Sequence, residues 1–539
     1  MCSSPSDAEV VIVGAGAAGL SAAVSLIHNY NFKHVRILEG SQRYGGRIHT
    51  VYHDKVGIEL GAQFIHARGS EIYQLAKELN NLSPRQAFPA GSPYHAFYLP
   101  GGKKLSNNLV RAFEEFHDFV AEEIDLHPDA FPDTVSIGDR FLAYFRDPEL
   151  FKDAFRRCCS DSELAAQESE LRALLRSFER VAEYYTNVEH SSSSWTDVGI
   201  ESYSSYEDLP EHEAITLGLL DFLVDHLPRH TISYRSQVTK ISYAGGEKVR
   251  LELVGGSLLW ADHVILTPSI GYLRANHQTL FDPPLPEDKV HYIESIGFGK
   301  VEKIIFIFPT VFWPNDVRVI MFLTENGTPS PDAPFLAQSL TVFSRLPNIP
   351  NGLIAWVVGP HVDHVVAARL PDLVDAMKYQ FRKYLQIDTV PNPFKVFRSW
   401  WSTNPLTLGS YSYFPTHPHL TARQSKSFRQ PLMGPANQSE GSNSATPTVP
   451  RVLFAGEATS AHHWSTVHGA YESGQREARR LNDFYCAGRR SKGATRTRNA
   501  SPGDLNDSSN GATQARPFWH SLVPTTSSLL IVLSLFLYI

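Results

Sequence analysis

The sequence has little cysteine and no excess of basic residues. Its 539 residues include four cysteines. They are Cys2, Cys158, Cys159 and Cys486, and their spacing fits no metal-binding motif. So few thiols are typical of a reducing compartment. The 49 Lys and Arg are outnumbered by 56 Asp and Glu, which gives a formal net charge of −7. This balance argues against a nucleic-acid binder, which normally presents a basic face.

No secretory signal peptide is visible, because the first nine residues are few and polar and are followed directly by a patterned apolar run. No internal repeat is evident. The chain is longer than one compact domain usually is, and 42% of its residues are hydrophobic. We therefore expect two interleaved domains with sizeable cores.

The most informative pattern begins with an apolar run at 10–13, followed by Gly-Ala-Gly-Ala-Ala-Gly at 14–19 and a second apolar run at 35–38 that ends at Glu39. Strand, glycine loop, helix, strand and acid follow one another in this order in a dinucleotide-binding α/β fold. The first glycine permits a tight turn, and the second lets the backbone approach a pyrophosphate at the helix N-terminus. The third lets helix and strand pack closely, and Glu39 is placed to bind a ribose hydroxyl.

A second glycine pair followed by arginine, at 45–47, distinguishes a flavin from a nicotinamide. Arg47 can neutralise a bound pyrophosphate. With this motif, residues 9–47 resemble the N-terminal pattern of the flavin-dependent amine oxidases. Residues 59–66, Glu-Leu-Gly-Ala-Gln-Phe-Ile-His, resemble the segment that this family runs beside the isoalloxazine. The resemblance implies a Rossmann-like FAD-binding domain interleaved with a substrate domain of mixed sheet and helices.

The apolar periodicity indicates that the FAD-binding domain is discontinuous. Helices are expected at 105–125, 162–185, 217–227, 370–384 and 469–481, and strands at 231–243, 249–254, 263–267, 300–308, 317–322 and 353–358. The FAD-binding domain is assigned to 8–83, 212–290 and 398–485, and the substrate-binding domain to 84–211 and 291–397. Residues 421–450, rich in Ser, Gln, Asn, Pro and Thr, are predicted to be a mobile surface loop.

The chain ends in a polar linker at 486–520 and an uncharged hydrophobic tail at 521–539, which is about long enough to cross a bilayer. Three interpretations compete: a tail anchor, a glycolipid-anchor signal, and a helix packed on the protein or on a partner. The glycolipid signal requires entry to the secretory pathway. Because no signal peptide is visible, we favour a membrane tail anchor with the enzyme in the cytosol. If the tail is not an anchor, we expect a cytoplasmic protein.

Near the C-terminus an apolar run at 451–455 is followed by a glycine and an acid, Gly456 and Glu457, and then by an expected helix. In the resembled family this strand carries the acid to the ribityl and pyrophosphate region, and the helix directs its positive end at the flavin. The resemblance therefore makes Glu457, Thr466 and Val467 cofactor contacts. The alternative is a strand and helix that merely complete a Rossmann sheet.

Lys303 is the leading catalytic candidate, because it lies in a strand whose faces are otherwise largely apolar. A lysine is expensive to bury without a purpose. From the residues alone, pairing with Glu302 or a distant acid is an equal alternative. The resemblance implies that the Lys303 amine holds a water against flavin N5.

The segment 400–413 resembles the flavin-flanking tryptophan and cage segment of the family, which implies roles for Trp400 and Tyr411. Tyr411 would stack beside the substrate nitrogen. Ser410 occupies the position where the monoamine oxidases attach flavin to cysteine, so we predict non-covalent FAD. Thr466 replaces the second cage tyrosine, and this favours the animal polyamine oxidases.

His66 agrees with the same branch, where a histidine contacts the substrate amine, although an isolated histidine is often structural. Glu189 aligns loosely with an acid at the pocket mouth and could equally be a solvated helix end. The resemblance gives catalytic roles to Lys303, His66 and Tyr411, and substrate contacts to His66, Glu189 and Tyr411. It gives FAD contacts to Gly14, Gly16, Ala17, Gly19, Glu39, Arg47, Gly61, Ala62, Gln63, Phe64, Val238, Trp400, Glu457, Thr466 and Val467.

The sequence therefore predicts a polyamine oxidase similar to the spermine and acetylpolyamine oxidases. A secondary amine would lose hydride to FAD, water would hydrolyse the imine to an aldehyde and a shorter amine, and O2 would be reduced to hydrogen peroxide. An amino acid oxidase or a histone-demethylating relative are alternatives within the fold. From a different class, the chain could be an idle flavoprotein that binds a membrane partner.

Overall fold

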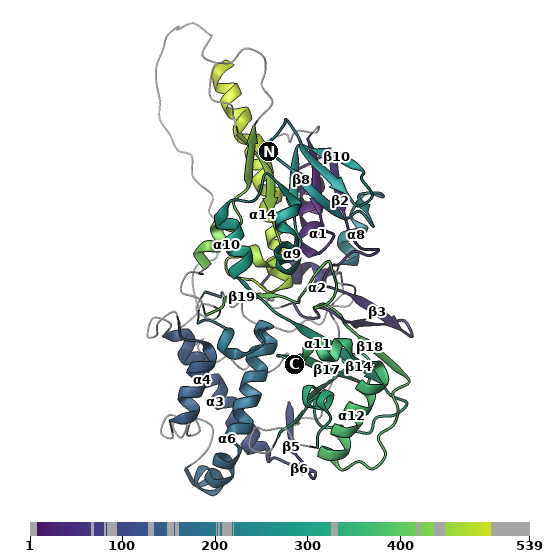
Figure 1. The fold of residues 1–539 in the computed structure, drawn as a ribbon, viewed down its shortest axis with the longest axis vertical. Coiled ribbons are helices and arrows are strands. Elements are labelled where there is room, and N and C mark those ends of the chain that lie inside the picture. The colour runs from purple at the N-terminus through teal and green to yellow at the C-terminus, as the bar shows by residue number, and fades with distance from the viewer. Residues whose placement is uncertain are drawn as a thin grey trace.

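The computed structural model shows an elongated molecule with two parts along its long axis (Figure 1). It describes residues 8–65, 69–79, 82, 94–127, 134–147, 156, 161–200, 202, 205–206, 218, 220–324, 332–416, 420, 422–435 and 448–496. One part holds both α1 (Ala17–Val24) and α14 (Val467–Arg496). The other holds α3 (Asn107–Leu126) and α12 (Leu370–Leu385).

The first part is built on a six-stranded sheet whose strands come from distant segments of the chain. Its order is β20 (Leu432–Pro435), β21 (Thr448–Phe454), β11 (His263–Leu266), β1 (Glu9–Val13), β2 (His34–Leu38) and β7 (Ile232–Ser233). All neighbours pair in parallel except β20 and β21. Parallel strands are covered on both faces, which explains their continuous apolar runs.

A smaller sheet and two helices complete this part. The sheet has the order β10 (Leu258–Ala261), β9 (Val249–Leu253), β8 (Val238–Ser242) and β12 (Phe281–Asp282). The helices are α9 (Ile270–Leu280) and α10 (Glu287–Ser295). The expected domain boundary at residue 290 falls inside α10, whose Tyr292 hydroxyl donates to the Ala458 carbonyl at 2.8 Å. Helix α10 thus contacts the first part.

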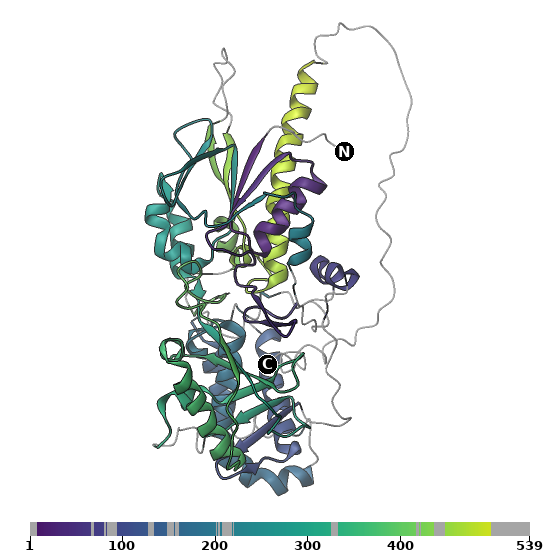
Figure 2. The same cartoon turned by 90° about the vertical axis from the view of Figure 1, so that its right-hand side faces the viewer.

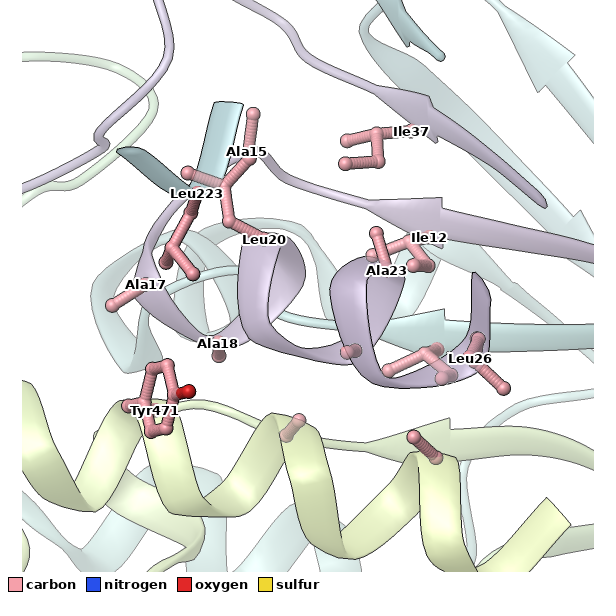
Figure 3. Packing of buried hydrophobic residues seen from close by; sticks show 14 of the residues in the cluster. Ile12, Ala15, Ala17, Ala18, Leu20, Ala23, Leu26, Ile37, Leu223 and Tyr471 are labelled. Carbon is pink, nitrogen blue, oxygen red and sulfur yellow. The ribbon is translucent and has the colours of Figure 1, made fainter. Parts of the chain in front are cut away.

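Helices α1 and α14 pack against each other, as both views show (Figure 1, Figure 2). The Ser21 hydroxyl donates to the Tyr471 carbonyl at 2.6 Å. A Cβ added to Gly474 would lie 2.1 Å from the Ala18 carbonyl oxygen, so only glycine allows this approach. Small residues line the α1 side of the contact (Figure 3). The close approach fixes the start of α14 relative to the glycine loop that precedes α1.

The second part is a seven-stranded sheet covered on both faces by helices. Its order is β18 (Lys395–Arg398), β14 (Val301–Ile307), β17 (Gly352–Val358), β16 (Val342–Arg345), β15 (Val319–Phe322), β5 (His95–Leu99) and β6 (Lys103–Lys104). Phe97 and Met321 join the core formed with α3, α4 (Ile137–Arg146) and α6 (Asp161–His190). Tyr98 and Ile320 join the opposite core, formed with α12 and α11 (Val362–Ala367).

The remaining elements are short. They are η1 (Ser25–Asn29), β3 (Thr50–His53), β4 (Val56–Glu59), α2 (Glu71–Glu78), η3 (Trp195–Asp197), α8 (Asp221–Asp225), β13 (Gly297–Phe298), η5 (Phe335–Ser339), β19 (Ser412–Tyr413), α13 (Ala422–Phe428) and η6 (Glu457–Thr459). Hairpin β3–β4 leads into the segment that begins at Glu59 and is part of the candidate site.

The prediction of a loop at 421–450 is wrong for its described ends, which form α13, β20 and the start of β21. The reason is a distant side chain: Lys289 on α10 donates hydrogen bonds to the Ser427, Phe428 and Gln430 carbonyls at 2.7–2.9 Å. These bonds satisfy carbonyls at the end of α13.

The polar linker predicted at 486–520 begins as helix, since α14 continues to Arg496. The hydrophobic tail at 521–539 lies outside the described residues. Among the helices that are described, none is long and apolar enough to cross a membrane.

Candidate active site

The glycine loop after β1 has the geometry that the sequence predicts. Gly14 has a φ of +105°, which favours glycine, and its N–H donates to the Leu38 carbonyl at 2.8 Å. A Cβ on Gly19 would lie 1.9 Å from the Gly14 carbonyl oxygen, so helix and loop can pack only without a side chain there. Gly16, the N-cap of α1, receives no side-chain capping bond, and the first turn holds no acid. The positive end of α1 is therefore open to an anion.

A second glycine turn lies beside the first and completes a cradle. Gly45 and Gly46 have φ values of +102° and +57°, and the Gly45 N–H donates to the Ala15 carbonyl at 2.8 Å. A Cβ added to Gly16 would find its nearest heavy atom 3.9 Å away. A Cβ on Gly46 would likewise find its nearest heavy atom 3.6 Å away, so bare backbone and free space lie at Gly16 and Gly46. Such a cradle fits the pyrophosphate of FAD.

Glu39 holds the glycine loop from the end of β2. Its carboxylate accepts the Ala15 and Ser41 N–H groups, both at 2.8 Å. Each carboxylate oxygen can accept a second hydrogen bond, so the predicted contact with a ribose hydroxyl stays open. The Glu39 carbonyl accepts the Ser236 N–H, two residues before Val238 at the buried start of β8. The structure therefore brings two of the predicted FAD contacts, Glu39 and Val238, close together.

A partly buried ion pair joins the N-terminal and C-terminal motifs. Arg47 Nη1 donates to Glu457 Oε1 at 2.8 Å and to the Ser410 carbonyl at 2.9 Å. The other Glu457 oxygen accepts the Ser412 hydroxyl and the Ser465 N–H. Arg47 is predicted from the sequence to face the pyrophosphate, and its pairing with Glu457 was not predicted. A guanidinium has five N–H donors, so Arg47 can serve both partners.

The N-terminus of α14 is capped by Thr466, whose hydroxyl accepts the Gly469 N–H at 3.0 Å and donates to the His463 carbonyl at 2.8 Å. Val467 is the first residue of the helix and is buried. The partial positive charge of this helix end lies next to the Ser465 N–H that contacts Glu457. Two predicted cofactor residues, Thr466 and Val467, therefore lie at a helix end that is tied to Glu457 through Ser465.

Lys303 is buried, with 3% of its surface exposed. Its ammonium donates to the Gly61 carbonyl at 2.6 Å, to Gln63 Oε1 at 2.5 Å and to the Glu59 carbonyl at 3.2 Å. It also lies 4.5 Å from the centroid of the Trp356 ring, within reach of a cation–π contact. The structure thus joins Lys303 to the 59–64 segment, as the resemblance implies. No described hydrogen bond or ion pair links Lys303 to the Glu302 side chain, whereas a distant acid, Glu59, does act on its charge.

Two buried groups of this site titrate near neutral pH. Burial lowers the pKa of Lys303 to about 7, and the Glu59 carboxylate opposes the shift. Burial raises the pKa of Glu59 to about 7, opposed by the hydrogen bond from Thr50 and by the charge of Lys303. Titration near pH 7 suits a group that handles protons during catalysis. Glu59 was not predicted to be a titratable group of the site. The signal for it in the sequence is that this acid directly precedes the Leu-Gly-Ala motif of the 59–66 segment.

The two neighbouring tryptophans differ in burial, and the buried one is not the one that the resemblance implies. Trp400, the predicted flavin contact, is 57% exposed, whereas Trp401 is 6% exposed. The Trp401 indole N–H donates to the Leu60 carbonyl at 3.2 Å, and its ring closes over Gly61, where a Cβ would lie 3.0 Å from Cζ2. Trp401 is therefore the residue placed beside the 59–64 segment, whereas Trp400, the predicted flavin contact, faces solvent.

Tyr411 lies in the same apolar cluster as Phe64 and Tyr184. Its hydroxyl donates to the Val188 carbonyl. Burial and, secondarily, the Glu189 carboxylate raise the pKa of Tyr411 above its usual value, so the phenol is neutral. The structure thus brings two of the predicted substrate residues, Tyr411 and Glu189, to one place.

Glu189 and Ser410 flank Tyr411 in different ways. A Glu189 oxygen lies 3.7 Å from His190 Nε2, but burial lowers the pKa of His190 to about 3. The imidazole is therefore neutral, and the pair is not a salt bridge. The Ser410 hydroxyl donates to the Val301 carbonyl at 2.9 Å and accepts the Val301 N–H at 2.8 Å. His66 lies outside the described residues.

The comparisons with known proteins agree with these motifs. Residues 17–482 match the family described as "Flavin containing amine oxidoreductase". The human peroxisomal N(1)-acetyl-spermine/spermidine oxidase is 30% identical over 511 residues, which covers 88% of this chain and 95% of that protein. Probable polyamine oxidase 5 of Arabidopsis thaliana is 26% identical over 540 residues, covering 89% and 98%.

A third relative, the lysine-specific histone demethylase 1 homolog 2 of Arabidopsis thaliana, is 27% identical over 490 residues, covering 88% of this chain but 58% of the relative. The match to the family spans most of the chain, and the two glycine turns, the open end of α1 and the Arg47–Glu457 pair fit FAD. The chain belongs to the flavin-containing amine oxidoreductases and is an FAD-dependent amine oxidase.

Proposed function

We propose that the protein is a polyamine oxidase that acts on a secondary amine of spermine, spermidine or their acetylated derivatives. The observation that carries this proposal is the similarity, along almost the whole chain, to proteins named as acetylpolyamine and polyamine oxidases. The site supports it, because a carboxylate, Glu189, lies beside Tyr411 and suits a substrate that carries a second ammonium.

Bound FAD would accept hydride from the carbon next to the substrate nitrogen and pass the electrons to O2, giving hydrogen peroxide. The chain's own residues supply binding and proton handling. Tyr411 and Phe64 offer apolar ring surface, and Lys303 can give or take a proton near neutral pH. Water then hydrolyses the resulting imine to an aldehyde and a shorter amine. The Ser410 hydroxyl, held by the Val301 backbone, supports FAD that is bound without a covalent link.

The alternatives are distinguishable. An amino acid oxidase needs a cation for the substrate carboxylate, whereas the charged group described beside Tyr411 is the Glu189 carboxylate. The match to the relative named as a histone demethylase covers 58% of that protein, whereas the matches to the two named as oxidases of polyamines cover 95% and 98%, so the similarity favours a polyamine oxidase. An idle flavoprotein is disfavoured by Lys303, a buried amine whose pKa of about 7 suits proton transfer.

The test is to purify the full-length holoenzyme, record the flavin spectrum and measure peroxide release. The substrates are spermine, spermidine, their acetylated forms, benzylamine and a mixture of L-amino acids. We expect turnover of at least one polyamine and release of all FAD on acid precipitation. FAD-loaded protein that is silent on every polyamine would refute the proposal. Flavin that stays with the acid pellet would refute non-covalent attachment.

We also propose, from the uncharged sequence of 521–539 alone, that this segment anchors the enzyme to a membrane with its catalytic part in the cytosol. A fluorescent reporter fused to residues 489–539 should fractionate with membranes. A reporter that remained entirely in the supernatant would refute the anchor.

A further inference from the structure

Glu302 is a buried acid immediately before Lys303, and no ion pair to it occurs among the residues that the structure describes. Its side chain is completely inaccessible to solvent. One carboxylate oxygen accepts the Ser399 hydroxyl at 2.5 Å, and the other accepts the Ser402 N–H at 2.8 Å. Burying a carboxylate is costly unless hydrogen bonds compensate it. These bonds therefore hold the turn at 399–402 firmly against β14.

Ser399 extends this contact to the backbone of Lys303. The Ser399 hydroxyl accepts the Lys303 N–H at 2.7 Å, and the Ser399 N–H donates to the Lys303 carbonyl at 3.0 Å. Ser399 follows directly after β18, which pairs with β14 up to Ile304 and Arg398. The carboxylate of Glu302 thus fixes the point where the chain leaves the edge of the sheet, beside the residue that carries the catalytic amine.

The turn at 399–402 carries Trp401. Trp401 and Lys303 donate hydrogen bonds to the carbonyls of two adjacent residues. The indole N–H binds the Leu60 carbonyl, and the Lys303 ammonium binds the Gly61 carbonyl. A displacement of the turn would therefore move the indole relative to the ammonium. The close contact of the Trp401 ring with Gly61 leaves little room for such a shift. The Glu302 side chain is linked to the indole and to Lys303 through the turn, where it accepts hydrogen bonds from Ser399 and Ser402.

We propose that Glu302 is a positioning residue that fixes Trp401 relative to Lys303 and thereby sets the geometry of the flavin-facing side of the site. It acts through the turn at 399–402 and touches neither substrate nor FAD. The proposal depends on FAD binding, which the family supplies, and not on which amine is oxidised. Its test therefore remains valid if the polyamine assignment fails.

The decisive variant is Glu302→Gln, which keeps the volume but removes the charge and replaces one acceptor oxygen with an NH2 donor, so the Ser399 hydroxyl and the Ser402 N–H can no longer each donate to an oxygen of their own. We expect anaerobic flavin reduction to slow about 10- to 100-fold, since small misplacements of reacting groups have effects of this size. KM should change less than about 3-fold, because substrate contacts are untouched. The visible absorption bands of bound FAD should also shift, and this readout needs no substrate.

Gln380→Leu is the matched control. The buried Gln380 amide on α12 donates to the Ala337 and Leu340 carbonyls, so its loss also leaves buried polar groups unpaired. This variant should lose comparable thermal stability yet keep the flavin spectrum and a reduction rate within about 2-fold of the wild type. If both variants alter spectrum and rate alike, Glu302 is merely structural and the proposal fails.

Ser399→Ala provides a second, milder test. It removes the hydroxyl between Glu302 and the Lys303 N–H and leaves the carboxylate in place. Its effect on flavin reduction should not add to that of Glu302→Gln, because both break one network. If Glu302→Gln yields no holoenzyme, Ser399→Ala alone decides. A wild-type reduction rate and spectrum in that variant would overturn the proposal.

Discussion

The burial of Lys303 makes a quantitative prediction about stability and pH for the variant Lys303→Met. The folded protein lowers the pKa of this amine from 10.5 to about 7. Between these values the unfolded chain holds the proton and the folded chain does not. The unfolded state therefore binds more protons, and stability contributed by this position rises with pH. Methionine has no such dependence.

The magnitude follows from the shift itself. Each pH unit inside the window is worth up to about 1.4 kcal/mol, so the wild type should gain roughly 2.5 kcal/mol over the variant between pH 8 and pH 10. This range lies above the pKa of Glu59, which is about 7, so the acid stays ionised throughout. Loss of the hydrogen bonds that the neutral amine makes in this range adds an offset, and the slope is insensitive to that offset.

The assay is urea unfolding of both holoenzymes with equal excess FAD at pH 8, 9 and 10, followed by circular dichroism. Lys300→Met is the control, because the Lys300 ammonium is partly exposed and pairs with Asp363 at 2.6 Å. Its difference from the wild type should stay flat within about 0.5 kcal/mol. A flat difference for Lys303→Met would show that its amine keeps its proton at pH 10, and the reasoning from burial would be wrong. The Lys303→Met variant should also retain FAD while flavin reduction or reoxidation slows strongly.

Three further predictions concern the cofactor site. Gly19→Ala should abolish FAD binding, measured by absorbance after gel filtration, because its Cβ would lie 1.9 Å from the Gly14 carbonyl oxygen; retained FAD would contradict the packing. Glu457→Gln should weaken FAD binding about 10-fold or more in titrations of the apoprotein, because it removes the charge that pairs with Arg47, and an unchanged Kd would speak against this role. Thr466→Ala should lower the free energy of unfolding by about 1 kcal/mol through loss of the α14 cap, and no change in thermal midpoint would exclude the capping bond.

Local patterns predicted most of the nucleotide-binding sheet and the central strands of the second sheet. The glycine loop at 14–19 was predictable because backbone sterics require glycine there, and the strand at 300–308 was predictable because its apolar run is continuous. Lys303 stood out for the same reason, as a charge in an apolar strand. The strands β1, β11 and β14 are confirmed close to their expected limits.

Features that depend on distant partners were not predictable. Helix α13 forms in a segment of loop-like composition because Lys289, more than 130 residues earlier, binds its carbonyls. Trp400 and Trp401 are chemically identical in the sequence, and only the turn held by Glu302 decides which of them is buried. The pairing of Arg47 with Glu457 likewise joins residues 410 positions apart.

The contact between α1 and α14 has a consequence for folding during translation. The hydrogen bond from Ser21 to Tyr471 spans 450 residues. At roughly 5–20 residues per second, a ribosome needs roughly 20 to 90 s to synthesise that interval. During this time the glycine-bearing helix has been made and its lasting neighbour has not. The nascent α1 must therefore wait, exposed or shielded by a chaperone, and the cofactor can be captured only near the end of translation.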